Sequence, residues 1–254
     1  MLRATVWRWC RLLALALWIV LLLGCQDDSK HRIVGQWKGV GAQGANQDHA
    51  EFAADNHCEL TRGGRALGYC MWTPRDDHAF DVVSDVPLVG VVDGDRMWLK
   101  QDKQSAVSAW VRAGSKLEAT VTVFTKGQSL IQAGEYEQGI AALKEAAGQD
   151  YAGAQNSLAW VYATAKDARF QDGKKAVAYA EKAVAHLRHP MYLDTLAAAL
   201  ARNGQLKKAV DTEAEALSLL AKASDLSPED RQTAAERFRT RIGLYQGGRA
   251  YTEE

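Results

Sequence analysis

Apolar residues recur at helical spacing through residues 189–217, and a turn divides the pattern into two short helices. Leu193, Leu196 and Leu200 lie three or four residues apart, which places them on one face of a helix. Gly204 then ends this helix, because Gly adopts the left-handed cap conformation without a side-chain clash. The second helix carries the pattern at Leu206, Ala209, Val210, Glu213, Ala216 and Leu217. The segment therefore predicts a helical hairpin.

The hairpin pattern occurs three times. Its small-large-Gly-small-small template comprises Ala197, Leu200, Gly204, Ala209 and Ala216. An earlier segment matches it at every offset, with Gly127, Leu130, Gly134, Gly139 and Ala146. A middle copy lies between them and has a longer loop at residues 164–173. This recurrence predicts a stack of three hairpins.

The pattern resembles the tetratricopeptide repeat, whose period is ~34 residues. The resemblance places three repeats at residues 115–223, about 117–150, 151–189 and 190–223. An unrelated Ala-rich helical bundle is the alternative. Stacked hairpins of this family form an extended concave binding surface lined by the first helix of each repeat.

The resemblance also assigns groove positions, by which the array would hold an extended peptide or a partner helix. They are Gln128, Gln132, Asn156, Trp160, Asp194 and Arg202. Trp160 has two interpretations. An exposed Trp is a common binding hot spot, but the ring could also be a core aromatic beneath the longer loop.

Residues 33–113 alternate apolar and polar positions, which is the period of a β-strand. Strands are predicted at 33–40, 50–61, 66–73, 79–83, 86–92, 96–101 and 107–112. Asp93-Gly94 suits a tight hairpin turn, because Gly tolerates positive φ. Short strands at this spacing predict an antiparallel sandwich or small barrel, so the whole chain is expected to be an α+β protein.

Three short segments of this β-domain resemble small lipocalin-like domains of bacterial lipoproteins: Gly35-Gln36-Trp37, the E-F-x-x-D-N run at 51–56, and Trp110-Val111-Arg112. The resemblance implies a barrel that could enclose a lipid-like ligand in a cavity lined by Trp37, Phe52, Trp72 and Trp98. The alternative is a filled structural module, which a narrow barrel favours because its own side chains occupy the interior.

Cys58 and Cys70 are predicted to form a disulfide. Their midpoint is residue 64, inside a turn-like Arg-Gly-Gly-Arg stretch, so a hairpin folded there places the two cysteines opposite each other. Zinc binding by these cysteines with His57 and His78 is the other chemistry considered. The spacing does not fit it, because adjacent residues of a strand point to opposite faces. No metal is therefore predicted.

The first 24 residues have the pattern of a secretory signal. Arginines precede a run of twelve apolar residues at 12–23, which is too short to cross a ~30 Å hydrocarbon core. The sequence Leu22-Leu23-Gly24-Cys25 then resembles the bacterial lipobox. That resemblance implies cleavage before Cys25 and acylation of this residue, with lipid and palmitate chains that anchor the protein to a membrane. A plain secretory signal is the alternative.

The residue after the cysteine bears on localisation. By the same resemblance an Asp there favours the inner membrane, whereas Gln26 favours the outer membrane, facing the periplasm. Residues 25–32 are polar and predict a tether between lipid and fold.

The helical part has recognisable boundaries. Ser115 and Glu118 form a capping-box pattern at its start. After the repeats, a helix at 227–245 begins with Ser-Pro-Glu-Asp and is expected to cover the apolar end of the stack. Its Ala234, Ala235, Phe238 and Ile242 form the predicted apolar stripe, and its Arg231, Arg237, Arg239 and Arg241 are interpreted as a solvated face. Residues 246–254 are a predicted tail.

Composition narrows the function. The chain has 254 residues, 47% of them hydrophobic and 24% charged, which is ordinary for globular proteins. Its 31 basic residues equal its 31 acidic ones, so no basic excess points to nucleic acid. The sequence contains no familiar catalytic or cofactor motif. These observations favour a membrane-anchored adaptor for an envelope protein partner. A small-molecule carrier and an enzyme without a recognisable motif are the alternatives.

Overall fold

The structure is a computed structural model that describes residues 32–40, 48–62, 65–76, 78–84, 87–101, 107–223 and 228–253. The predicted signal of 1–24, the lipidation site Cys25 and nearly all of the tether lie outside these residues. Within the described ranges, no helix is long and apolar enough to cross a membrane.

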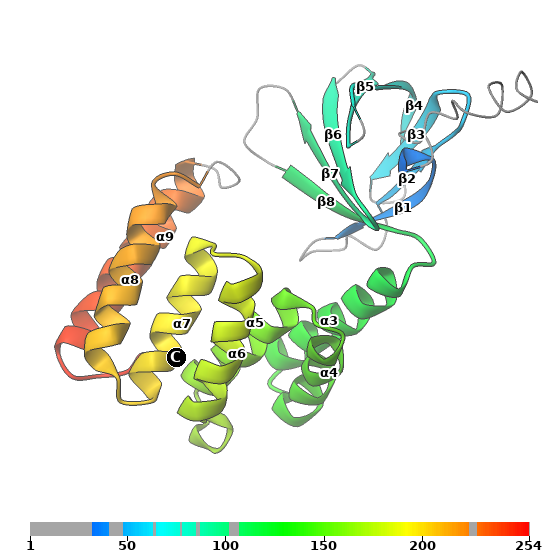
Figure 1. Ribbon diagram of the computed structural model, residues 1–254. Coiled ribbons are helices and arrows are strands. Elements are labelled where there is room, and N and C mark those ends of the chain that lie inside the picture. Colours follow the sequence, from blue (N-terminus) through cyan, green and yellow to red (C-terminus); the bar gives the residue numbers. More distant parts are fainter. Residues whose placement is uncertain are drawn as a thin grey trace, which may run out of the picture.

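The first part of the chain is a closed antiparallel barrel of eight strands in sequence order (Figure 1). The strands are β1 (Gly35–Val40), β2 (His49–Phe52), β3 (His57–Arg62), β4 (Arg65–Pro74), β5 (Ala79–Val83), β6 (Leu88–Asp93), β7 (Arg96–Gln101) and β8 (Val107–Arg112). Each strand pairs with the next, and β8 pairs with β1 to close the ring. The barrel is thus the correct one of the two predicted β architectures.

The single strand predicted at 50–61 is wrong, because a turn divides it into β2 and β3. Phe52 pairs with Cys58, and the five residues between them reverse the chain. Asn56 adopts a φ of 73° and donates its backbone N–H to Ala53 O at 3.1 Å. Asn favours this left-handed conformation. The division supplies the eighth strand of the barrel.

Large side chains fill the barrel interior. Trp37, Phe52, Trp72 and Phe80 are each at most 1% exposed, and the last three contact one another edge to face. Gly90 leaves room for the Phe80 ring, since a Cβ there would lie 2.1 Å from it.

Trp98 does not join the interior aromatics, so its predicted place in a barrel cavity is wrong. It lies between Met97 and Leu99, which are 0% and 3% exposed. Successive strand residues point to opposite faces, so the half-buried Trp98 belongs to the outer face.

The predicted register of the cysteine hairpin is correct. Cys58 of β3 pairs with Cys70 of β4, with Cα atoms 4.9 Å apart and sulfur atoms 2.20 Å apart, at disulfide distance. His57 instead contacts Asp55, and His78 contacts the Val92 carbonyl. The residues considered for zinc therefore have other partners.

A capped turn joins the barrel to the helices. Ser115 Oγ accepts the Glu118 N–H at 3.1 Å, as the capping-box pattern predicts. The reciprocal bond differs, because Glu118 Oε2 accepts the N–H of Gly114 rather than that of Ser115. Glu118 also pairs with Lys38 of β1 at 2.5 Å, which links the barrel to the first helix.

The second part comprises seven α-helices in the described residues (Figure 1). They are α3 (Lys116–Gln132), α4 (Tyr136–Gly148), α5 (Ala152–Thr164), α6 (Gly173–His186), α7 (Pro190–Arg202), α8 (Leu206–Leu220) and α9 (Pro228–Gln246). The pairs α3/α4, α5/α6 and α7/α8 form three successive hairpins, and α9 packs on α8 and α7. The 3₁₀ turn Ala168–Phe170 lies in the longer loop of the middle hairpin.

The template residues occupy the tight points of the hairpins. Gly134 and Gly204 turn the chain with φ values of 82° and 76°, where a side chain would be strained. Ala197 and Ala209 are 0% exposed at the contact between α7 and α8. Small residues therefore let the paired helices approach closely.

Gly127→Ala is expected to destabilise the first hairpin by about 1–3 kcal/mol. A Cβ at Gly127 would lie 2.9 Å from Leu143 Cγ and 3.1 Å from the Leu143 backbone nitrogen, so the helices must separate. Urea unfolding followed by helical circular dichroism measures the change. Gly148→Ala is the matched control, because its Cβ meets nothing within 4 Å and Ala favours the helix. Equal stability of the two variants would refute close packing at Gly127.

Candidate functional site

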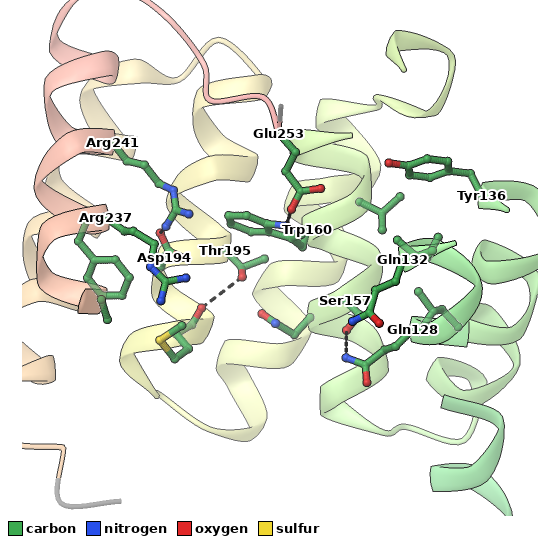
Figure 2. A pocket seen from close by; sticks show the side chains of 17 residues that line it. Gln128, Gln132, Tyr136, Ser157, Trp160, Asp194, Thr195, Arg237, Arg241 and Glu253 are labelled. Atoms are coloured by element: carbon green, nitrogen blue, oxygen red, sulfur yellow. Dashed lines mark hydrogen bonds and ion pairs between the residues drawn. The ribbon is translucent and has the colours of Figure 1, made fainter. Parts of the chain in front are cut away.

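The helical part contains a cavity of about 550 Å³ between the first helices of the hairpins and α9 (Figure 2). Helices α3, α5 and α7 provide most of one wall, Arg237 and Arg241 of α9 face them, and Glu253 lies above Trp160. The cavity is concave, mixed in polarity and formed by residues distant in sequence, as binding sites usually are.

Five of the six predicted groove residues line this cavity: Gln128, Gln132, Asn156, Trp160 and Asp194. The sixth, Arg202, does not. Its guanidinium donates to the carbonyls of Ala163 and Tyr251 at 2.6 and 2.7 Å, so it holds the chain after α9. The structure therefore places five of the positions together and gives Arg202 a different contact.

One side of the cavity carries amide groups. Gln128 Nε2 is 3.5 Å from Ser157 Oγ, and Gln132 is exposed. Asn156 Oδ1 is buried and has no hydrogen-bond partner among the described residues. An orphaned acceptor of this kind costs free energy unless a ligand or water donates to it. This wall is therefore suited to the N–H groups of an extended peptide.

Trp160 lies in the middle of the cavity (Figure 2). Its Nε1 donates to Glu253 Oε1 at 2.5 Å, and its ring faces the guanidinium of Arg241, 4.8 Å from the ring centroid. The ring is half-buried and also packs against the core of the middle hairpin. Trp160 thus lines the cavity, as the binding interpretation predicts, and also packs against the hairpin core, as the alternative predicts.

A buried cluster of charged groups forms the α9 side of the site. Arg241 Nη1 contacts Asp194 Oδ1 at 2.5 Å, and the two residues are only 6% and 3% exposed. The expectation that Arg241 belongs to a solvated face is therefore wrong. Burial raises the pKa of Asp194, and the Arg241 charge opposes that rise.

Glu213 of α8 completes the cluster and is 0% exposed. Burial, followed by the charge of Asp194, raises the pKa of Glu213 to about 11. Since Arg241 contacts Asp194 directly, we place the negative charge on Asp194 and the proton on Glu213. Both Glu213 carboxyl oxygens are buried without a hydrogen-bond partner among the described residues, and a neutral carboxyl costs less in such a position than an ionised one. The cluster fixes α7, α8 and α9 against each other beside the cavity.

The sequence held signals for both missed residues. Glu213 falls within the apolar pattern of its helix, so the pattern predicts that this carboxyl is buried. Arg241 follows Ala234 and Phe238 at spacings of four and three, and Tyr245 comes four later. These four residues are the buried stripe of α9, with Arg241 and Tyr245 in place of the predicted Ala235 and Ile242.

The described residues include no group of three or more His, Cys, Asp or Glu side chains placed to hold a metal ion. The fold and the cavity define a two-part α+β protein, in which a filled barrel precedes three helical hairpins and a covering helix. No protein-family model matches the chain, and neither a curated protein nor a solved structure is significantly similar to it.

Proposed function

We propose that this protein is an envelope lipoprotein whose tetratricopeptide-like hairpins bind a protein partner. The observation that carries the proposal is the cavity, because five groove positions from three separate hairpins line one concavity. Repeat geometry supports the family assignment, since Gly134 and Gly204 make equivalent turns. The amide wall, the Trp160 ring and Arg237 together suit a polar, extended polypeptide.

The proposed anchor is the lipid on Cys25, which would hold the protein at the outer membrane facing the periplasm. The support is the apolar run of 12–23 followed by Leu-Leu-Gly-Cys and then Gln26. A Cys58–Cys70 disulfide is compatible with this oxidising compartment.

Cys25→Ser is expected to abolish palmitate incorporation and to release the protein from the membrane fraction. The thiol is the attachment atom, and a hydroxyl does not replace it in the proposed modification. Labelled palmitate fed to expressing bacteria, followed by fractionation, measures both effects. Cys58→Ser with Cys70→Ser controls for loss of thiols in general. Continued labelling of the Cys25→Ser variant would refute the anchor.

The partner is tested by co-purification from solubilised envelopes. Replacing Gln128, Gln132 and Asn156 together by Ala is expected to abolish recovery of a specific envelope protein. The matched control replaces Gln138, Lys144 and Glu145 of α4, which are exposed and do not line the cavity. Equal recovery by the two triple variants would contradict the proposal.

The barrel offers less support for the lipid-carrier alternative. Five aromatic side chains occupy its interior among the described residues, and Trp98 lies on the outside. We therefore assign the barrel a structural role between the anchor and the hairpins. Among the described residues, nothing favours the enzyme alternative over binding.

A further inference from the structure

We propose that residues 247–253, here called the return segment, are a built-in occupant of the binding site, and that the partner is an extended segment of similar chemistry that replaces them. That chemistry is an aromatic residue followed two positions later by a carboxylate. This inference rests on the proposed function, because it specifies which partner the same cavity binds.

The main chain of the return segment is held as a bound peptide would be. It leaves α9 and passes across the ends of α5 and α7, where Arg202 Nη2 donates to Tyr251 O and Thr252 Oγ1, each at 2.7 Å. The Glu253 N–H then donates to Thr164 O at 2.8 Å. Thr164 is the last residue of α5, so its carbonyl has no successor within the helix. The hairpins thus offer donors and acceptors to an extended chain.

Two side chains of the return segment have matching subsites. The Glu253 carboxylate accepts the Trp160 indole N–H at 2.5 Å. The Tyr251 ring lies 4.7 Å from the Arg241 guanidinium and 5.9 Å from the Trp160 ring, and the same guanidinium lies 4.8 Å from the Trp160 centroid. A cation in contact with two rings is a favourable arrangement, and the buried Asp194 contact keeps Arg241 in place. An aromatic ring and a carboxylate two residues apart therefore define the sequence that this site recognises.

The return segment leaves much of the cavity available. Among its described residues only Glu253 lines the cavity, and Gln128, Gln132 and Asn156 line it as well. Figure 2 shows Glu253 approaching Trp160 while the two glutamines lie beyond the ring. A longer segment could occupy the Glu253 position and continue to these amides. It would gain contacts that the return segment does not make, including a donor for Asn156 Oδ1.

Replacement is physically reasonable because the return segment is irregular in structure and partly exposed to solvent. It has no helix or strand, Thr252 is exposed, and Tyr251 and Glu253 are only partly buried. An attached occupant nevertheless competes at an effective concentration in the millimolar range. The partner's apparent affinity falls in proportion to the fraction of sites left open. A partner must therefore bind tightly enough to displace the return segment, which favours a segment of matching chemistry.

The test uses a fluorescent synthetic peptide with the sequence of residues 248–253 and measures its anisotropy on binding. The chain shortened to end at Ala250 is expected to bind this peptide at least about tenfold more tightly than the full chain, because the site is vacated. A peptide with Ala in place of Tyr251, and one with Gln in place of Glu253, are expected to bind more weakly. A peptide of the same composition in scrambled order is the control. Trp160→Phe in the shortened chain should lower affinity, since Phe keeps a ring but lacks the donor.

A second variant covers the case in which the shortened chain does not fold. Glu253→Ala in the full chain keeps Tyr251 and the Arg202 contacts, and it should bind the peptide more tightly than the unchanged protein. Amide exchange at position 253 should rise in this variant. Equal peptide affinity of the opened and full chains, with native circular dichroism in both, would overturn the proposal.

The outcomes separate this inference from the proposed function. Peptide binding by the opened chain without any envelope partner would uphold the site chemistry and reject the adaptor role. The other outcome is that the cavity triple variant loses the partner, but an opened and folded chain does not bind the peptide. That result would reject the return segment as an occupant.

Discussion

Arg241→Met is expected to lower the free energy of unfolding of the helical part by about 3–5 kcal/mol, the usual cost of removing one partner from a buried ion pair. Arg241 and Asp194 are 6% and 3% exposed, with 2.5 Å between Nη1 and Oδ1. Without the guanidinium, Asp194 keeps a desolvated carboxyl beside a second buried carboxyl, Glu213. The change also removes the cation that contacts both the Trp160 and Tyr251 rings.

Urea unfolding followed by helical circular dichroism measures this effect. Arg239→Met is the control, because Arg239 is an exposed arginine on the same helix and surface substitutions usually change stability by less than about 0.5 kcal/mol. Combining Arg241→Met with Asp194→Asn should restore part of the loss, since no unpaired charge then remains at Asp194. A cost below about 1 kcal/mol for Arg241→Met would show that the pair does not hold α9 on the stack.

Glu213→Gln is expected to stabilise the protein, and the gain should grow as the pH rises. In the folded state the pKa of Glu213 is raised from 4.5 to about 11 by burial and by the Asp194 charge. Between these values the unfolded chain has released the proton while the folded chain keeps it. Unfolding therefore releases a proton, and a higher pH favours the unfolded state.

The size of this effect follows from proton linkage. A single such group lowers the free energy of unfolding by at most about 1.4 kcal/mol for each pH unit. Coupling to Asp194 reduces that slope. The advantage of Glu213→Gln over the unchanged protein should therefore be about 2–4 kcal/mol larger near pH 8 than near pH 5.

Urea titrations at the two pH values measure the Glu213 effect. Asp211→Asn, an exposed position on the same helix, controls for the general loss of one carboxylate. Parallel pH profiles of the Glu213→Gln variant and the unchanged protein would mean that Glu213 is ionised in the fold, contrary to the arrangement described above.

Local patterns predicted the parts of the fold that depend on neighbours in sequence. The turn-like stretch around residue 64 indicated which cysteines pair, and a register shift between Leu60 and Thr61 brings Cys58 opposite Cys70. Gly134 and Gly204 marked the turns of two hairpins, since only a residue without a side chain takes that φ freely. Five groove positions followed from the resemblance to the tetratricopeptide repeat, which implies that the first helix of each repeat lines the concave face.

Contacts between distant elements were not predictable in this way. The spacing of Arg241 from Ala234 and Phe238 indicates a buried position, but its partner Asp194 is identified only when α9 is placed against α7. The resemblance assigned Arg202 to the groove, and no local pattern shows that residues 251 and 252 return to it. Trp98 was grouped with the interior aromatic residues, although strand alternation with Met97 and Leu99 places it outside.

The central claim is that the hairpin cavity binds an envelope protein, and crosslinking in intact cells tests it most directly. A photoreactive amino acid is placed at Gln132 or Arg237, which are exposed and line the cavity, and at Lys144 as an exposed position away from it. Light is expected to produce an adduct with the same protein at Gln132 and Arg237 and none at Lys144. No protein adduct at either cavity position, or equal adducts at all three, would contradict it.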